Sequence, residues 1–376
     1  MVQLTHDERN KNSRLLGTSK KALLLVIALT VGSLCFRPLF GTKREVQVDK
    51  WAIQKTDPSF VIDPLLSDSV TDPWKRELFA RLDRIRLLCG ELCDITDAAS
   101  YAAHSVAVPH GAFPQIKAKV DCDALMNSED IDVGDTTVPY PPPQELMPYY
   151  TLNGMIQFKL TKKYTNVYLG GKALSNVWTK EMVEKGMEQA ETGTLAGTYG
   201  VKVTSSVRDK LRNADLKGKT VLVIGSERPW VESICLYLGA SMVTTLEYGS
   251  ITSHHPKIRT MIPSQFRAGY KDGTLGKFDV IVSWSSLEHS GLGRYGDALN
   301  PWGDILAVAR AWCVTKPGGK MQLGIPTGQD LIEFNPHRWY GEVRWPLITA
   351  NWKNINSDFS GFGGGDMDRG FLFEKV

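Results

Sequence analysis

A glycine and an acidic residue stand at a spacing that suits a nucleoside. Gly225 lies in the short apolar run Thr220–Ser226, and Glu247 stands 22 residues later, in a second run, Met242–Tyr248. In nucleotide-binding α/β sheets, a carboxylate about 20 residues after the glycine turn accepts hydrogen bonds from ribose hydroxyls. The pair therefore predicts a site for an adenosine-containing cofactor.

An imidazole follows a third apolar run. His289 comes five residues after the run Phe278–Trp284. Because an unperturbed imidazole titrates near neutral pH, His289 is the first candidate for a catalytic base, and Asp297 on the glycine-rich loop beyond it is the second. Each has an ordinary alternative, since Glu288-His289 could cap the following turn and Asp297 could be a plain turn residue.

Short apolar stretches alternate with helical ones and would position these groups. The expected strands are 220–226, 242–248, 278–284, 320–325 and 370–376, and the expected helices are 176–191, 205–214, 230–238 and 302–313. This alternation predicts an α/β fold with a Rossmann-like, doubly wound, mostly parallel sheet. Ligands of such sheets bind outside the carboxyl ends of the strands, where Gly225, Glu247 and Ser283–His289 are expected to meet.

The ordered set of segments resembles a known class of enzymes. Val221–Ser226, Glu247, Phe278–His289 and Lys316–Gly319 are similar to the cofactor-binding strand, the ribose acid, the post-strand Leu-Glu-His motif and the Lys-Pro-Gly-Gly turn of class I S-adenosylmethionine-dependent methyltransferases. The resemblance implies their Rossmann-like fold and S-adenosylmethionine as the cofactor.

A narrower resemblance covers roughly Gly197 to the C-terminus. Gly225–Trp230 together with Glu288–Asp297 resembles an uncharacterised methyltransferase-like family, abundant in nematodes and known as domain of unknown function 268.

The glycine loop departs from the methyltransferase pattern, which reads acidic-x-Gly-x-Gly-x-Gly. Val223 stands at the acidic position, Glu227 at the second glycine and Pro229 near the third. Side chains in place of glycines approach the methionine part of the cofactor. The Glu227 carboxylate would either oppose the carboxylate of the cofactor or hold its ammonium group.

The resemblance and the sheet geometry together predict the cofactor site. Its expected residues belong to the glycine turn, the ribose acid, the end of the third strand and a lid, and they are Gly225, Ser226, Glu227, Glu247, Ser283, Ser285 and Tyr199. The lid is the segment Gly197–Gly200, for which a plain turn is the alternative.

Two polar and aromatic segments are candidates for the acceptor site. Arg294 and Tyr295 lie on the glycine-rich loop, and His337 and Arg338 lie in the segment Asn335–Tyr340. Hydrogen-bonding groups beside aromatic rings are typical of sites for sugars or polar rings. The alternative for the second segment is a capped helix start with Trp339 in the core.

The N-terminal region predicts a membrane anchor. The apolar run 22–36 has 15 residues and follows Lys20-Lys21, so a span over 22–40 would be short. The excess of basic residues before the run predicts that 1–21 lie in the cytosol and that the chain after the span lies in the lumen of the endoplasmic reticulum or Golgi. Residues 41–72 are expected to form a stem. The alternative is a cleaved signal peptide and a secreted protein.

A helical and proline-rich extension, 73–200, precedes the methyltransferase-like domain, 201–376. Asp72-Pro73 predicts the start of a helix over about 74–94, with an apolar stripe that includes Leu78, Leu82 and Ile85. We expect the stripe to pack on the same chain, with a dimerising stem as the alternative. The sequence does not indicate an oligomeric state.

The cysteines indicate an oxidised pair. Cys235 and Cys313 fall in expected helices and are interpreted as buried thiols. In an oxidising lumen Cys122 is expected to bridge to Cys89 or Cys93, which lie one helical turn apart.

Composition excludes some classes of function. With 44 basic and 41 acidic residues the formal net charge is +3, which argues against nucleic acid as a partner. The adjacent pair His254-His255 is interpreted as solvated, so no metal site is predicted. A nucleotide-sugar transferase would need an Asp-x-Asp motif, and the matches 121–123, 130–132 and 366–368 are expected to lie outside the sheet ends.

These observations predict a membrane-anchored O-methyltransferase that acts on a glycan or another hydroxylated small-molecule acceptor of the secretory pathway. The alternative is a non-catalytic binding or scaffold protein. The degenerate glycine loop, with Val223 and Glu227, favours this alternative, whereas Glu247 and the Leu-Glu-His run favour the enzyme.

Overall fold

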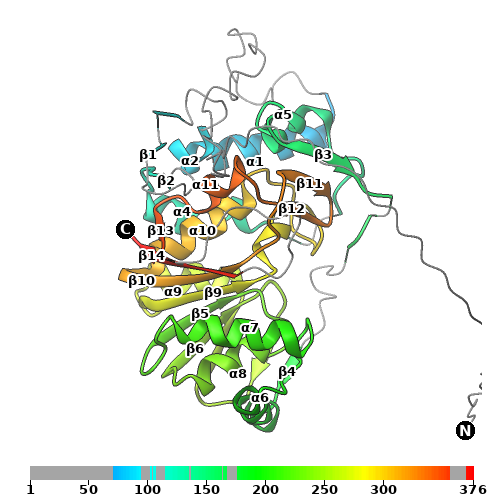
Figure 1. The fold of residues 1–376 in the computed structure, drawn as a ribbon. Coiled ribbons are helices and arrows are strands. Elements are labelled where there is room, and N and C mark those ends of the chain that lie inside the picture. The colour runs from blue at the N-terminus through cyan, green and yellow to red at the C-terminus, as the bar shows by residue number, and fades with distance from the viewer. Residues whose placement is uncertain are drawn as a thin grey trace, which may run out of the picture. The chain divides into compact units, whose positions relative to one another are not determined.

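A seven-stranded sheet organises the part of the chain that the computed structural model describes, which is residues 71–94, 102–103, 105–106, 115–134, 137–162, 164–166, 176–355 and 370–376 (Figure 1). Its strands are β5 (Thr220–Ile224), β6 (Met242–Leu246), β8 (Ile258–Met261), β9 (Phe278–Trp284), β10 (Thr315–Gly324), β13 (Trp352–Asn354) and β14 (Gly370–Lys375). The order across the sheet is β13-β14-β10-β9-β5-β6-β8. The strands from β8 to β10 run parallel, and β14 runs antiparallel to β10 and β13.

The direction of winding reverses between β5 and β9. From β5 the chain moves outward through β6 to β8, and it then returns to the other side of β5 with β9 and β10. Such a reversal is a topological switch point, and ligands of α/β sheets bind there. The prediction of a doubly wound, mostly parallel sheet is confirmed for the described residues.

Helices cover both faces of the sheet (Figure 1). One face carries α7 (Val201–Arg212) and α8 (Trp230–Tyr237), with α6 (Lys180–Thr192) packed on α8, and the other carries α9 (Pro263–Lys271) and α10 (Gly303–Val314). Val221 and Val223 of β5 pack in the core under α6 to α8, whereas Leu222 packs in the core with Phe266 of α9. Because both faces are buried, the strands read as continuous apolar runs in the sequence.

The N-terminal extension packs against this domain. Helix α1 (Pro73–Cys89) begins at Asp72, whose side chain accepts a hydrogen bond from Trp74 N at 3.0 Å. The expected stripe of α1, which includes Leu82, is buried in one core with Trp302 and Ile305 of the sheet domain. The prediction that the stripe packs on its own chain is confirmed. The helix stops at Gly90, φ +56°, and resumes as α2 (Glu91–Asp94).

Smaller elements complete the described chain. They are α4 (Cys122–Asn127), the 3-10 helices η2 (Asp130–Asp132), η3 (Gln144–Leu146) and η5 (Leu287–His289), α5 (Met147–Thr151), α11 (Arg344–Ile348), the sheet of β12 (His337–Trp339), β11 (Leu331–Phe334) and β3 (Gln157–Leu160), and the pairs β1 (Ser105–Val106) with β2 (Gln115–Ile116) and β4 (Asn176–Trp178) with β7 (Ile251–Ser253).

One local prediction and one alternative interpretation were wrong. The segment expected as a helix from residue 176 begins as strand β4, because the Thr179 side chain accepts a hydrogen bond from Met182 N and so caps α6 at that point. The segment Asn335–Tyr340 is not a helix start, because His337–Trp339 pairs with β11 as an antiparallel strand.

The predicted cysteine pairing was also wrong. Cys89 bonds to Cys93, and Cys122 bonds to Cys313 of α10. The short break at Gly90 brings the first pair together, and the packing of α4 on α10 brings together the second. Cys235 is free and buried, as expected.

The predicted tail and membrane anchor lie outside the described residues, as does most of the predicted stem. Among the residues that are described, no helix is long and apolar enough to cross a bilayer.

The two disulfides differ in the length of chain that they close, which gives a test of the pairing. Cys122 and Cys313 are 191 positions apart and Cys89 and Cys93 only 4. Replacing Cys122 and Cys313 by serine should lower the free energy of unfolding by about 2–4 kcal/mol. A disulfide that closes a long loop removes the most conformational freedom from the unfolded chain. The matched replacement of Cys89 and Cys93 should cost clearly less. Urea unfolding without reductant measures both, and equal losses would contradict the assigned pairing.

Candidate functional site

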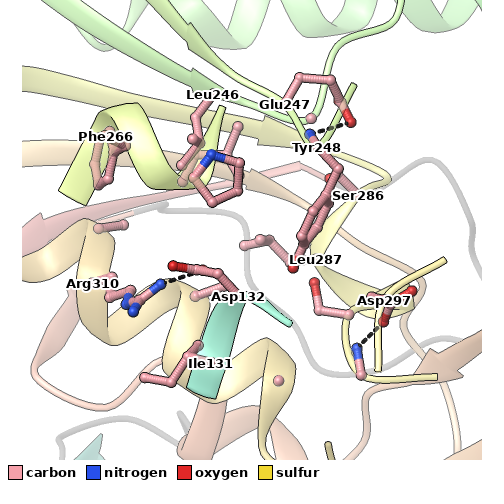
Figure 2. Close-up of a pocket in the computed structure, with 18 of the residues that line it drawn as sticks. Ile131, Asp132, Leu246, Glu247, Tyr248, Phe266, Ser286, Leu287, Asp297 and Arg310 are labelled. Carbon is pink, nitrogen blue, oxygen red and sulfur yellow. Dashed lines mark hydrogen bonds and ion pairs between the residues drawn. The ribbon is translucent and has the colours of Figure 1, made fainter. Parts of the chain in front are cut away.

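Two adjoining cavities lie where β5, β6 and β9 end. The first has a volume of about 100 Å³ and the second about 150 Å³. Residues that line both are Gly225, Glu247, Tyr248, Ser286, Ser290 and Asp297. Figure 2 shows the first cavity, with Glu247 and Tyr248 at one side and Asp132 and Arg310 at the other. The cavities occupy the carboxyl edge of the sheet at its switch point, as the sequence predicted for the site.

The turn after β5 is shaped for close approach of a ligand. Gly225 has φ +76°, and a Cβ there would collide with the Ser286 hydroxyl. The next amide, Ser226 N, donates to Glu247 Oε2 at 2.9 Å, and Tyr248 N donates to Glu247 Oε1 at 2.9 Å. Burial raises the pKa of Glu247.

The acceptor oxygens of Glu247 fit the ribose hydroxyls of an adenosine-containing cofactor. A carboxylate offers about four lone-pair positions, and the two backbone amides occupy one on each oxygen. The backbone amide of Gly249 also hydrogen-bonds this carboxyl, and a position is left that can accept a ribose hydroxyl.

Glu232 is a buried carboxyl that the sequence analysis missed. It is fully buried in α8, where its oxygens accept hydrogen bonds from Ser226 Oγ at 3.0 Å and Thr245 Oγ1 at 2.7 Å. Burial raises its pKa to about 7. An acid inside the mainly apolar run 230–236 was the available signal, since a lone carboxyl there must find partners.

The outer rim of the second cavity includes two of the expected cofactor residues. Glu227 is exposed and lines this cavity together with Trp230 and Tyr199. The Tyr199 ring lies edge-on to Trp230 at 6.2 Å between centroids. The segment Gly197–Gly200 therefore borders the cavity, where the lid was expected.

The two serines expected at the end of β9 differ in position. Ser283 Oγ donates to the Ile224 carbonyl at 3.2 Å, so it joins two strands, and it does not line either cavity. Ser285 has φ +48°, unusual for a residue with a side chain. It lines the second cavity and donates to Glu288 Oε1 at 2.7 Å.

His289 lines the second cavity in a defined tautomer. Its Nδ1 lies 2.5 Å from the Pro336 carbonyl, which can only accept, so Nδ1 carries the hydrogen and Nε2 the lone pair. Nε2 lies 3.5 Å from Glu288 Oε1. Burial and the nearby Arg294 lower the pKa of His289 to about 3, and burial raises the pKa of Glu288 to about 7.

Asp297 shapes the glycine-rich loop. Its Oδ2 accepts from Gly291 N at 2.5 Å and from Gly293 N at 3.4 Å, and Oδ1 accepts from Tyr295 N at 3.2 Å. These hydrogen bonds are those of a residue that stabilises a turn, which was the alternative interpretation of Asp297. The residue also lines both cavities. Its catalytic role stays a prediction.

The expected acceptor residues are only partly brought together. The Tyr295 ring lies edge-on to His289 at 5.3 Å and lines the second cavity. Arg294 donates to the Pro336 carbonyl at 2.9 Å, and His337 lies 6.3 Å from His289 between ring centroids. Arg338 is fully buried, and it donates to the Ser290 carbonyl at 2.6 Å. Arg338 therefore stabilises the glycine-rich loop and does not line either cavity.

One residue expected outside the site lies within it. Asp132, the second acid of an Asp-x-Asp match, lines the first cavity, so the expectation that this motif lies away from the sheet ends was wrong. Its oxygens are bound by Arg267 and Arg310. Over the described part of the chain, no group of three or more His, Cys, Asp or Glu side chains is placed to hold a metal.

The strand order, the switch-point cavities and the ribose-type carboxylate define a Rossmann-like domain of the methyltransferase-like kind. Residues 218–365 match the model of the family described as Caenorhabditis protein of unknown function, DUF268. A sequence comparison with curated proteins gives no significant match.

Several solved structures are similar at low identity. The Burkholderia thailandensis 1,6-didemethyltoxoflavin-N1-methyltransferase, with bound S-adenosylhomocysteine, is 13% identical over 46% of this chain and 78% of its own, with a TM-score of 0.31. A cyclopropane-fatty-acyl-phospholipid synthase-like protein from Lactobacillus casei is 12% identical over 38% and 58%, with a TM-score of 0.26. The mycinamycin-pathway methyltransferase MycE is 16% identical over 37% and 33%, with a TM-score of 0.24. The strand order β13-β14-β10-β9-β5-β6-β8 assigns the fold class.

The buried Glu232 makes stability depend on pH. Below pH 4.5 the carboxyl is protonated in the folded and unfolded chain. Between pH 4.5 and about 7 only the unfolded chain ionises, so the free energy of unfolding falls as pH rises, and above about 7 the loss is complete. Glu232→Gln should remove up to about 3 kcal/mol of this decline.

Urea unfolding at pH 5 and pH 8 measures the effect. Glu227→Gln removes an exposed carboxyl in the turn just before α8, so it is the matched control and should keep the wild-type decline. An unchanged decline in Glu232→Gln would show that Glu232 is ionised in the folded protein.

Proposed function

We propose that the two adjoining cavities bind S-adenosylmethionine. We further propose that the protein transfers the methyl group of this cofactor to a hydroxyl of a glycan or another secretory-pathway acceptor. The observation that carries the proposal is the carboxylate of Glu247, held by Ser226 N and Tyr248 N beside the Gly225 turn. When bound, S-adenosylmethionine supplies a methyl group on a positively charged sulfur.

Different residues of the two cavities bind different parts of the ligand. Glu247 accepts the ribose hydroxyls, and Gly225 admits the ligand close to the backbone. Glu227, exposed at the rim of the second cavity, holds the ammonium of the methionine part, because opposite charges attract most strongly near low-dielectric walls. Aromatic rings from Trp230, Tyr199 and Tyr295 enclose the same cavity and suit the face of a sugar ring.

His289 is the proposed proton acceptor. The hydroxyl proton of the acceptor moves to Nε2, and Nδ1–H stays on the Pro336 carbonyl. The pKa of about 3 makes the resting imidazole a weak base. Ionisation of Glu288, 3.5 Å away, would raise that pKa because a neighbouring negative charge favours the imidazolium.

A second candidate is a binding protein without catalysis. The low pKa of His289 favours it, since a buried imidazole of this kind resists protonation. In this case the two cavities would bind the nucleoside and the protein would not transfer a methyl group.

We also propose that the described domain lies in an oxidising lumen. This is the side expected for an anchored chain whose N-terminal tail is in the cytosol. Support comes from the two disulfides, because such bonds persist in secreted and lumenal proteins and are rare in the cytosol.

Calorimetric titration with S-adenosylmethionine and S-adenosylhomocysteine tests the binding step. We expect dissociation constants on the order of micromolar. Glu247→Ala should weaken binding about tenfold or more, since it removes charge-assisted hydrogen bonds. Glu184→Ala, an exposed acid of α6 paired with Lys180, should bind as the wild type does. A folded protein that gives no heat with either ligand would rule out the proposed cofactor.

Protease treatment of sealed microsomes tests the compartment. The domain after residue 72 should survive without detergent and be digested once detergent opens the vesicles. Digestion without detergent would place the domain on the cytosolic side and contradict the lumenal proposal.

A further inference from the structure

We propose that the N-terminal extension completes the nucleoside site and that Asp132 selects a base carrying a 6-amino group. The inference rests on the proposed function, because it concerns the adenine end of the same ligand. It goes beyond the family match, since Asp132 lies outside residues 218–365.

The first cavity has the character of a slot for a flat ring. Its apolar walls come from β5, β6, α9, η5 and α10 of the sheet domain and from η2 of the extension, and they include Leu246, Pro263, Phe266, Leu287 and Ile131. Figure 2 shows Leu246 and Phe266 across the space from Ile131. Apolar walls with few polar groups are typical of sites for heteroaromatic ligands.

The polar end of this slot is built by Asp132. Its Oδ2 accepts from Arg267 Nε at 2.6 Å, and its Oδ1 accepts from Arg310 Nη1 at 2.5 Å. Arg310 is itself held by the carbonyls of Leu125 and Ser128. The carboxylate is therefore fixed in orientation before any ligand enters, and the side chain is 10% exposed.

The ribose acid and Asp132 line one and the same cavity. Glu247 follows β6, and Asp132 of η2 lies on the opposite side of the cavity (Figure 2). A nucleoside with its ribose on Glu247 that directs its base into this cavity would present the edge of the base toward Asp132.

The chemistry of the carboxylate decides which edge is accepted. An ionised carboxylate only accepts hydrogen bonds. A 6-amino purine offers an N–H donor there, whereas a 6-oxo purine offers a carbonyl oxygen that would oppose the carboxylate. A site built to pair with a donor rejects the analogue that lacks it, because buried polar groups are left unpaired.

The contact between extension and sheet domain is held independently of any ligand. Cys122 at the start of α4 is bonded to Cys313 of α10, three residues beyond Arg310. The extension is therefore a fixed wall of the cavity.

Calorimetry of the full chain with S-adenosylhomocysteine and its 6-oxo analogue, S-inosylhomocysteine, tests the inference. The wild type should bind the amino compound at least about tenfold more tightly. In Asp132→Asn this ratio should fall toward one, because an amide presents a donor as well as an acceptor. The matched control is Asp130→Asn on the same 3-10 helix, whose carboxylate pairs with Arg84 and does not line the cavity, and it should keep the wild-type ratio.

The outcomes separate the inference from the function. Equal binding of both compounds by the wild type, or an unchanged ratio in Asp132→Asn, overturns the role of Asp132 and leaves cofactor binding intact. Absence of binding to either compound overturns the proposed function itself. If Asp132→Asn does not fold, Ile131→Trp decides, because its indole would fill the slot from a partly exposed position. Binding of S-adenosylhomocysteine should then weaken about tenfold or more, and unchanged binding would place the base elsewhere.

Discussion

The buried guanidinium of Arg310 governs how the extension meets the sheet domain. It lies on α10, with donors directed to the carbonyls of Leu125 and Ser128 and to the Asp132 carboxylate. A buried cation without partners costs several kcal/mol, and here every one of these partners belongs to the extension. The extension must therefore fold onto α10 for Arg310 to be buried, and Cys122–Cys313 then holds it there. One wall of the candidate site follows from this constraint.

Buried and half-buried carboxyls gather at the carboxyl edge of the sheet. Burial raises the pKa of Glu232, Glu247, Glu288 and Asp297, and each accepts hydrogen bonds from hydroxyls or backbone amides nearby. Such groups lower stability near neutral pH, and perturbed carboxyls are typical of functional sites. They also place acceptor oxygens in fixed directions, which a ligand does not have to reorganise. The electrostatic cost and the proposed binding function therefore belong to the same residues.

The strand pattern and the glycine turn could be read from the sequence because they depend on near neighbours. β9 occupies the predicted residues Phe278–Trp284, and Gly225 has the positive φ that a turn after a buried strand requires. Arg338 could not be placed in this way. A guanidinium in a polar and aromatic segment is expected at a surface, and only the packing of β12 under the loop that includes Ser290 buries it.

The alternation of strands and helices and the meeting of Gly225 with Glu247 could be predicted from the sequence, since periodicity and a spacing of 22 residues are local properties. The tertiary structure decided the partner of each cysteine and the placement of Asp132 in the first cavity. Cys122 and Cys313 are separated by 191 positions, and Arg310 and Leu125 by 185. Contacts at such separations depend on how whole elements pack, and no local pattern in either segment encodes its partner.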